Sequence, residues 1–282
     1  MQNGTTFQNN EYWVGSIASS SKFKASSRGV LDFGMYYAAR TGTTAGVSQS
    51  PTDRRIIFGA TGWAPPRGLP GCQPHTSMQI ELLPRDLALD QHSRLTITPI
   101  PELATLRRPS TRRATMFVTG TAADGVHQAR GSLLELRLNC TGRPSGAGLV
   151  GLKVLMGPDG TFTTVGYNYT ASELIIDHRH SSMKCPDRVT CGPKAIVQTA
   201  PLQGGGLGAT EGVELVVMLD GGLVEAYLNR RSVMSVWIVE VMNSTAAGYT
   251  PADRLATAIR PPAGVSCQFE SHELTPLVPL PS

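Results

Sequence analysis

Short stretches of β-branched and aromatic residues, separated by turns, recur along the chain. In the first hundred or so residues, such stretches alternate in part between apolar and polar positions, which predicts strands. They are residues 12–18, 36–40, 55–59 and 78–83. Four short strands in succession are what one blade of a β-propeller contains. We therefore predict a partial propeller over residues 1–98, and a single blade cannot close such a fold.

A second, longer series of predicted strands follows. Its members are residues 115–119, 131–138, 149–155, 162–167, 173–177, 212–219, 223–228, 232–239 and 265–269. Gly157-Pro158-Asp159-Gly160 marks a hairpin turn, because proline fixes φ and glycine supplies a positive φ. Short strands at this turn-bounded spacing predict a two-sheet β-sandwich over residues 114–282.

Residues 99–113 separate the two predicted regions and read as a linker. Two prolines open the segment, one or two helical turns follow, and a basic run ends it at residues 107–113. A basic run can bind phosphates, but this one contains proline and no aromatic residue, which is more typical of a solvated connector. We expect no nucleic-acid partner.

The composition agrees with an all-β fold. The chain has 30 Gly and 20 Pro among its 282 residues, which suits many turns better than long helices. A net charge of +4 is too mild to indicate a polyanionic partner. No stretch approaches the ~20 apolar residues that a membrane span needs, and residues 1–10 lack the pattern of a signal peptide. We expect no membrane partner.

Possible modification sites point to a compartment. Asn-x-Ser/Thr sequons occur at Asn3, Asn139, Asn168 and Asn243, which are four of the seven asparagines. If they carry glycans, the protein passes through the secretory pathway, and we expect a secreted or vacuolar location.

The five cysteines are an odd number, so at least one is unpaired within the chain. Cys185 and Cys191 flank a short loop, and a local disulfide between them is our expectation; a zinc site would want tighter spacing and a second pair. His178 and His180 could form half of a metal site, but no third ligand is nearby in sequence. With no P-loop or dinucleotide fingerprint either, we expect no metal and no cofactor.

Five segments of the chain resemble segments of one protein family and occur in the same order. They are residues 31–40, residues 54–59 with Trp63, residues 83–90, residues 99–103 and residues 217–229. They are similar, in turn, to the Asp-(Tyr/Phe)-Gly…Phe-Tyr-Ala, Arg-Arg-(apolar)-Trp-Gly-Trp, Leu-Pro-Arg, Pro-Val-x-Glu-Leu and Asp-x-Ser-x-x-Glu-x-Phe-x-Asn segments of glycoside hydrolase family 32. The chain thus resembles the C-terminal portion of an invertase or related β-fructofuranosidase.

This resemblance implies a five-bladed propeller followed by a β-sandwich. It also implies retaining hydrolysis, in which one carboxylate attacks the sugar and a second, with a raised pKa, protonates the leaving oxygen. The family takes its acids from Asn-Asp-Pro, Arg-Asp-Pro and Glu-Cys segments, and none of these occurs in the chain. We predict no catalytic residue here, and no activity for this chain alone.

Part of the sugar pocket does have counterparts. The resemblance implies that Tyr37 and Trp63 line the fructosyl site, where aromatic rings suit sugar C–H faces. It also implies that Asp32 contacts the glucosyl unit of sucrose, although Met35 replaces the partnering Lys and Ala60 replaces a frequent Trp. The alternative is that these side chains only pack or cap the blade.

Three functional hypotheses follow. The chain is part of a fructoside-hydrolysing enzyme, a non-catalytic carbohydrate-binding sandwich, or one half of a split enzyme. The first is favoured, and a fructosyl-containing sugar is the expected partner, bound weakly or not at all by this chain alone. Asp220 and Glu225 lie across a predicted hairpin and could come close, but their segment is chiefly structural in the family.

Overall fold

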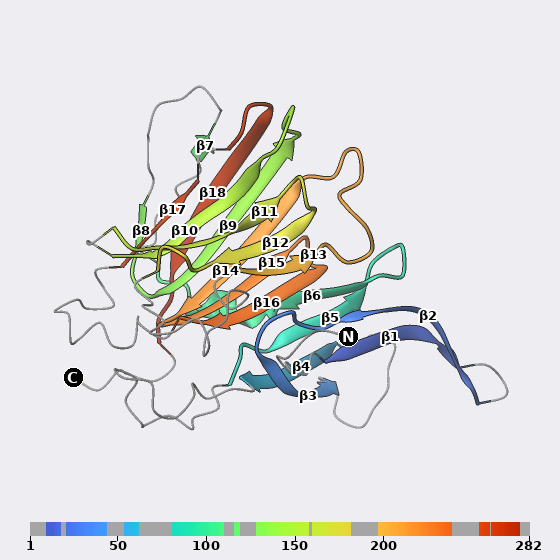
Figure 1. Cartoon of the computed structure of the whole chain (residues 1–282). Coiled ribbons are helices and arrows are strands. Elements are labelled where there is room, and N and C mark those ends of the chain that lie inside the picture. The colour runs from blue at the N-terminus through green and yellow to red at the C-terminus, as the bar shows by residue number, and fades with distance from the viewer. Residues whose placement is uncertain are drawn as a thin grey trace, which may run out of the picture.

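The computed structural model describes residues 10–17, 21–43, 54–61, 81–109, 116–118, 128–157, 160–181, 197–238, 254–259 and 261–276. These residues form four antiparallel sheets and one short 3-10 helix, so the all-β prediction is confirmed (Figure 1). Within these ranges, no helix has the length and apolar character needed to cross a membrane.

Two six-stranded sheets make up the C-terminal part of the chain. The first sheet has the order β13 (Val197–Pro201), β12 (Glu173–Asp177), β11 (Thr163–Asn168), β10 (Leu149–Met156), β17 (Leu255–Ala258) and β8 (Gln128–Arg130). The second has the order β16 (Ser232–Trp237), β15 (Leu223–Leu228), β14 (Val213–Asp220), β9 (Leu133–Gly142), β18 (Val265–Glu273) and β7 (Met116–Val118).

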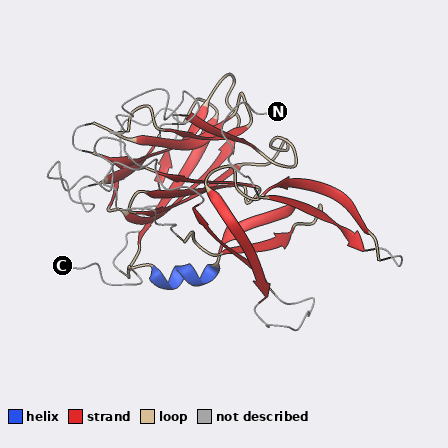
Figure 2. Cartoon of the chain, turned by 60° about the horizontal axis from the view of Figure 1, so that its bottom comes forward, coloured by secondary structure: helices blue, strands red, loops and turns tan. Residues whose placement is uncertain are grey.

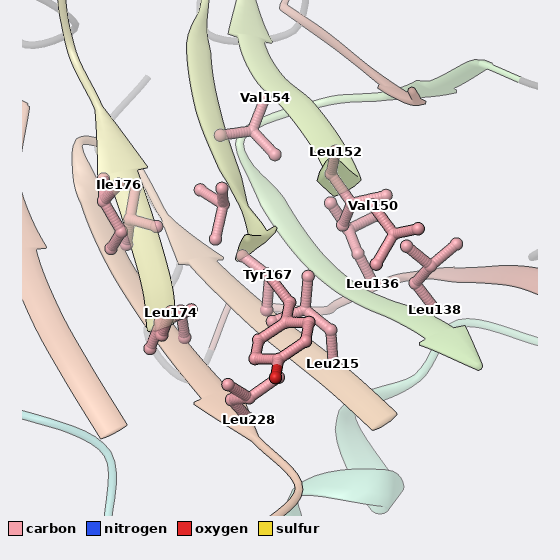
Figure 3. Packing of buried hydrophobic residues seen from close by; sticks show 14 of the residues in the cluster. Leu136, Leu138, Val150, Leu152, Val154, Tyr167, Leu174, Ile176, Leu215 and Leu228 are labelled. Carbon is pink, nitrogen blue, oxygen red and sulfur yellow. The ribbon is translucent and has the colours of Figure 1, made fainter. Parts of the chain in front are cut away.

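The two sheets pack face to face over one apolar core, and the β-sandwich prediction is confirmed. Alternate residues of β9, such as Leu136 and Leu138, point inward from the second sheet. Figure 3 shows them beside Val150, Leu152 and Tyr167 from the first sheet. Burial of this apolar surface is the main force that holds the sandwich together.

A disulfide links the paired strands β9 and β18. Cys140 and Cys267 lie directly opposite each other with their Cα atoms 4.0 Å apart, although they are 127 residues apart in sequence. This pair was not predicted from the sequence. The disulfide expected between Cys185 and Cys191 falls outside the described residues.

The N-terminal part contains two smaller sheets. Strands β1 (Glu11–Ile17) and β2 (Phe23–Val30) form a two-stranded ribbon. Strands β3 (Tyr36–Thr43), β4 (Arg55–Thr61), β5 (Arg85–Leu89) and β6 (Leu95–Pro99) form a four-stranded sheet in sequence order.

The predicted grouping of these N-terminal strands was wrong. The first predicted strand pairs with β2 and lies outside the four-stranded sheet. Within the described part of residues 78–83, only Glu81 pairs, in an isolated bridge to Ala60. Pro84 follows closely, and the strands that complete the sheet, β5 and β6, begin after it.

The four-stranded sheet covers the outer face of the sandwich at β14–β16 and forms a third layer (Figure 1). A second apolar cluster joins Tyr36, Ile57 and Ile97 of this sheet to Val216 and Tyr227 of the sandwich. The N-terminal region therefore shares a core with the sandwich.

The predicted linker is also packed in place. It contains the 3-10 helix η1 (Pro101–Leu106), whose Leu103 is buried in the second cluster. Arg107 forms an ion pair with the buried Glu135 at 2.7 Å, and Arg108 pairs with Glu273. The prediction of a solvated connector was wrong for Arg107, which packs against a buried carboxylate, whereas Arg108 is exposed in its ion pair.

Candidate functional site

Arg85 lies at the centre of a buried polar cluster between the four-stranded sheet and the sandwich. Its Nη1 is 2.8 Å from Asp32 Oδ2, and its Nη2 is 2.7 Å from Glu225 Oε2. All three side chains are at most 1% exposed. A buried guanidinium is stable only with such partners, since desolvation of an unpaired charge is very costly.

Further donors bind both carboxylates. Asp32 Oδ1 accepts hydrogen bonds from the backbone N–H groups of Gly34 (2.7 Å) and Ser235 (3.0 Å), and Oδ2 accepts one from the Ser235 hydroxyl (2.7 Å). Glu225 accepts from Leu83 N at 2.8 Å and from the Tyr227 hydroxyl at 2.9 Å. The cluster thus ties residues 203 apart in sequence, Asp32 and Ser235, into one network.

Two tyrosine rings enclose the guanidinium. The Arg85 Cζ atom lies 4.2 Å from the ring centre of Tyr36 and 5.3 Å from that of Tyr227, within cation–π range. Burial raises the pKa of Tyr36 to about 12, so its hydroxyl stays neutral over the physiological range. The cluster is a fixed structural connection between the two parts of the chain.

This placement bears on two candidate residues. The resemblance implies a sugar contact for Asp32, but its two oxygens accept from four donors within the protein, which leaves no acceptor position for a sugar hydroxyl. This geometry fits the alternative, in which the Asp32 side chain only packs within the fold. Glu225 accepts from three donors within the protein and is fully buried, which argues against the catalytic pair with Asp220.

Tyr37 faces the opposite side of the sheet from Tyr36. Its side chain is 40% exposed, whereas Tyr36 is buried, because neighbouring residues in a strand point to opposite faces. Tyr37 pairs with Ala60, and Ala60 pairs in turn with the exposed Glu81. Directly paired residues share a face, so Tyr37, Ala60 and Glu81 form a row on the solvent side. Trp63, the third candidate, lies outside the described residues.

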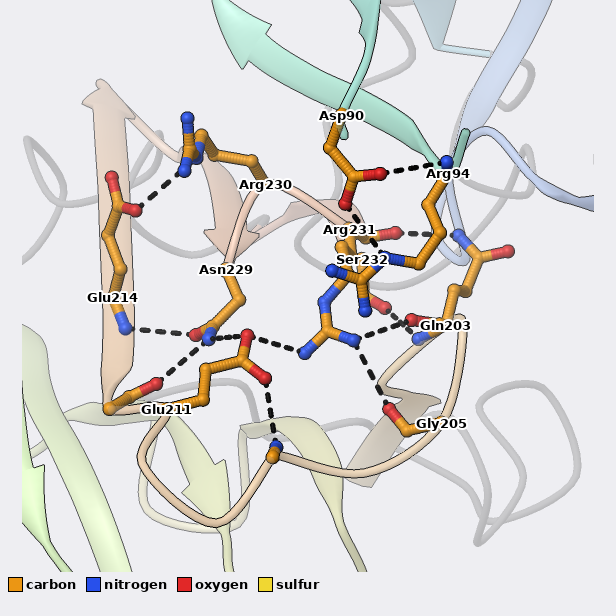
Figure 4. Close-up of polar contacts among 12 residues, drawn as sticks. Asp90, Arg94, Gln203, Gly205, Glu211, Glu214, Asn229, Arg230, Arg231 and Ser232 are labelled. Atoms are coloured by element: carbon orange, nitrogen blue, oxygen red, sulfur yellow. Dashed lines mark hydrogen bonds and ion pairs between the residues drawn. The ribbon is translucent and has the colours of Figure 1, made fainter. Parts of the chain in front are cut away.

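A second polar network fastens the ribbon and the β5–β6 turn to the sandwich (Figure 4). The buried Arg231 pairs with Glu211 at 2.7 Å, and its carbonyl accepts from the Gln203 side chain at 2.8 Å. Near it, Asp90 and Arg94 close the β5–β6 turn through a 2.7 Å ion pair. Arg231 and Arg94 are each paired with a carboxylate of this network, so its role is structural.

The two histidines of the proposed half-site are not equivalent. His178 is buried, whereas His180 is exposed and stacks on Phe162 with ring centres 4.9 Å apart. Among the described residues, no group of three or more His, Cys, Asp or Glu could hold a metal ion.

His178 should make the sandwich sensitive to acid. Its ring nitrogens have no hydrogen-bond partner within the described part of the chain, and burial lowers its pKa to about 4. Since the unfolded state takes up this proton near pH 6.5, stability falls as the pH drops through 6.5 toward 4. Between pH 8 and pH 5 we expect a loss of about 2 kcal/mol from this group.

Urea unfolding of the His178→Phe and His180→Gln variants at both pH values tests this expectation. The loss should shrink in His178→Phe and persist in His180→Gln. An unchanged pH dependence in His178→Phe would contradict it.

Two of the four sequons can be placed. Asn139 is exposed on the outer face of β9. Asn168 ends β11, where its Oδ1 accepts from Thr170 N at 2.9 Å in a turn. Asn3 and Asn243 fall outside the described residues.

The roles of Arg85 and Gln203 were not predicted from the sequence. Arg85 had a usable signal, since it stands at an inward position of a strand among apolar residues and in a segment already singled out by the resemblance. A charge there requires buried partners of opposite sign. Gln203 has no such signal, because nothing in its surroundings distinguishes it from a surface loop residue.

Comparisons with known proteins agree with this architecture. The family model described as the C-terminal domain of glycosyl hydrolases family 32 matches residues 102–251. A comparison with curated protein sequences finds no match.

Solved structures of three enzymes have a similar fold. An exo-inulinase from Aspergillus awamori is 15% identical with a TM-score of 0.68, and the match covers 95% of this chain and 50% of the inulinase chain. A β-fructofuranosidase from Aspergillus kawachii is 17% identical with a TM-score of 0.67, and the match covers 97% of this chain and 52% of the fructofuranosidase chain. A fructan 1-exohydrolase IIa from Cichorium intybus is 13% identical with a TM-score of 0.64, and the match covers 95% of this chain and 55% of the exohydrolase chain.

The chain therefore spans about half the length of these enzymes. At such low identity the likeness supports the fold alone. The family model covers more than half of the chain, including most of the sandwich. This chain belongs to glycoside hydrolase family 32 and carries the C-terminal domain of that family.

Proposed function

We propose that this chain is the C-terminal part of a β-fructofuranosidase-like glycoside hydrolase, whose full-length form cleaves fructosyl bonds of sucrose or fructans with retention. The observation that carries the proposal is the family match together with the absence of the three acid-bearing motifs from the sequence. In addition, the carboxylates of Asp32 and Glu225 are both held by Arg85. The chain alone therefore lacks the acid pair that retaining hydrolysis requires.

We further propose that the sheet β3–β6 is a terminal blade of a five-bladed propeller. Its four antiparallel strands follow one another in sequence order, as in propeller blades. The similar enzymes have about twice the length of this chain, which leaves room for further blades.

Tyr37 and Trp63 would then line one wall of a fructosyl pocket. The exposed ring of Tyr37 suits a sugar C–H face, and Ala60 beside it leaves that ring uncovered. Glu81, on the far side of Ala60, offers a carboxylate to sugar hydroxyls. We also propose a secretory route, which the exposed sequon residue Asn139 and the turn at Asn168 support.

The purified chain should release no reducing sugar from sucrose, raffinose or inulin. The physical reason is that the sequence contains none of the three motifs from which the family takes its nucleophile and its acid. An active β-fructofuranosidase serves as the positive control. Turnover that disappears in a Glu81→Gln or Glu225→Gln variant would overturn the proposal.

A carbohydrate-binding module is the second candidate function, and the row Tyr37, Ala60 and Glu81 favours it. Calorimetry with sucrose and inulin tests it, and any heat should vanish in Tyr37→Ala. Phe58→Ala is the matched control, since Phe58 is a similarly exposed ring on β4 outside this row. No heat with either sugar would exclude this function.

A further inference from the structure

The strand that carries Tyr37 contains an irregularity directly after that residue. Nearly all regular structure in the described chain is strand, so register decides where most side chains point (Figure 2). The pairing of β3 with β4 slips by one residue between Tyr37 and Arg40. Ala38 and Ala39 therefore oppose a single residue of β4, Gly59. This is a β-bulge, and bulges beside binding sites redirect neighbouring side chains.

The backbone at this bulge is strained. Among the described residues, seven that are not glycine have a positive φ, and five of these lie in the connections between strands. The other two, Ala38 (φ 52°) and Leu155 (φ 53°), lie inside strands, each at a bulge. Leu155 is buried in the sandwich core, so packing accounts for its bulge, whereas Ala38 has only an exposed methyl group. Strain that the residue's own packing does not explain points to a role in placing a neighbour.

The sandwich holds the chain on the other side of Tyr37. The N–H of Phe33 donates to the carbonyl of Val233 at 2.9 Å, on the edge strand β16. Two residues on, the N–H of Met35 donates to the carbonyl of Ser235 at 2.8 Å. Gly34 permits this approach, because a Cβ there would overlap the Ser235 carbonyl oxygen. The segment before the two tyrosines is therefore added to the edge of the sandwich as one more strand.

Tyr36 extends this support to Tyr37. Its ring is buried, with the Arg85 Cζ atom 4.2 Å from the ring centre. On the facing strand it covers Gly59, where a Cβ would overlap the ring. Its carbonyl accepts from the Asn10 side chain at 3.0 Å. Since the residue before Tyr37 is fixed and a strained bulge follows, the backbone of Tyr37 has little freedom and its ring keeps one direction.

We propose that the sandwich positions the ring of Tyr37. Pairing with β16 fixes the chain before that ring, and the bulge at Ala38 fixes the chain after it. Ser235, through its carbonyl, and Ala38 are thus positioning residues that act on a sugar only through Tyr37. The inference rests on the proposed fructosyl wall, and it gives the sandwich a part in sugar binding without any contact with the sugar. A ring that is held in advance binds more tightly, because it loses no freedom on binding.

Replacing Ala38 with glycine separates positioning from a purely structural role. Glycine adopts a left-handed φ without penalty, so the fold persists and the urea midpoint should not fall. If Ala38 served the sheet alone, the direction of Tyr37 would stay the same as well. Under our proposal glycine also frees the backbone, so the Tyr37 ring loses its fixed direction.

Fluorine NMR of the full chain labelled with fluorotyrosine reports on this direction. Tyr37→Phe assigns the signal of Tyr37 among the seven tyrosines. In Ala38→Gly that signal should move toward the position of free fluorotyrosine. Ser93→Gly is the matched control, since Ser93 also has a positive φ, of 58°, but lies in the β5–β6 turn. It should leave the Tyr37 signal in place.

A second variant tests the support from the sandwich. Gly34→Ala places a Cβ against the Ser235 carbonyl, so it should move the Tyr37 signal in the same direction and lower the urea midpoint. Gly42→Ala is its control, because a Cβ at Gly42, also on β3, meets no atom within 4 Å. If Gly34→Ala does not fold, Ala38→Gly still decides the question.

Calorimetry with inulin separates this inference from the sugar chemistry. Ala38→Gly should bind inulin about threefold to tenfold more weakly than the unsubstituted chain. If neither protein binds inulin but the Tyr37 signal moves, the positioning stands and the fructosyl wall fails. The positioning is overturned by a Tyr37 signal that stays in place in Ala38→Gly or in folded Gly34→Ala, by one that moves as far in Ser93→Gly, or by equal inulin binding in Ala38→Gly.

Discussion

Replacing Arg85 with methionine is expected to lower the free energy of unfolding by about 3–5 kcal/mol. The substitution leaves the carboxylates of Asp32 and Glu225 buried without their counterion. It also removes the contact with the Tyr36 ring. A loss of this size is a large fraction of the ~5–15 kcal/mol that stabilises a typical domain.

Denaturant unfolding measures this loss, and Arg54→Met is the matched control. Arg54 also bridges two carboxylates, Asp86 and Glu102, but its side chain is 36% exposed. Exposed pairs contribute about 0–1 kcal/mol because water and salt screen them. Similar losses in both variants would contradict a special role for Arg85.

A third variant separates lost pairing from lost packing. Combining Arg85→Met with Asp32→Asn and Glu225→Gln removes the unpaired charges, so it should recover part of the stability that Arg85→Met loses. If the triple variant is less stable than the single variant, the cost lies in packing and not in uncompensated charge.

Loss of the Cys140–Cys267 disulfide should have the next largest effect. The bond joins positions 127 residues apart, and closing a loop of that size restricts the unfolded chain by about 4–5 kcal/mol in the chain-entropy model. The double substitution Cys140→Ala/Cys267→Ala is expected to lower the unfolding free energy by about 2–5 kcal/mol.

Reduction provides an independent check of this expectation. Dithiothreitol should lower the melting temperature of the unsubstituted protein and have a much smaller effect on the double variant. A double variant that melts within a degree or so of the unsubstituted protein would show that strands β9 and β18 hold together without the bond.

The sandwich could be predicted from sequence because its longer strands alternate cleanly. In β9, Leu134, Leu136 and Leu138 point inward and polar residues stand between them. Strands β13 and β17 were not predicted, because their sequences lack such clean alternation. The first ends at Pro201, and the second contains two alanines, which have a weak preference for strands.

The candidate site was harder to predict, because its geometry depends on residues far apart in the chain. The sequence motif around Asp32 is the same whether the Asp32 side chain contacts a sugar or an arginine. Its orientation is set by Arg85 and by Ser235, which is 203 residues away. The opposite exposures of Tyr36 and Tyr37, by contrast, follow from strand alternation alone. The sequence does not show which of the two tyrosines points toward the sandwich.

The shared apolar cluster makes the sandwich dependent on the sheet that covers it. A protein that began at residue 114 would expose Val216, Met218 and Tyr227 on one face. On that same bare face, Glu225 would lose the cation that neutralises it. Such a shortened protein should aggregate, so the sandwich of this chain is not a portable domain that can be grafted elsewhere without its N-terminal cover.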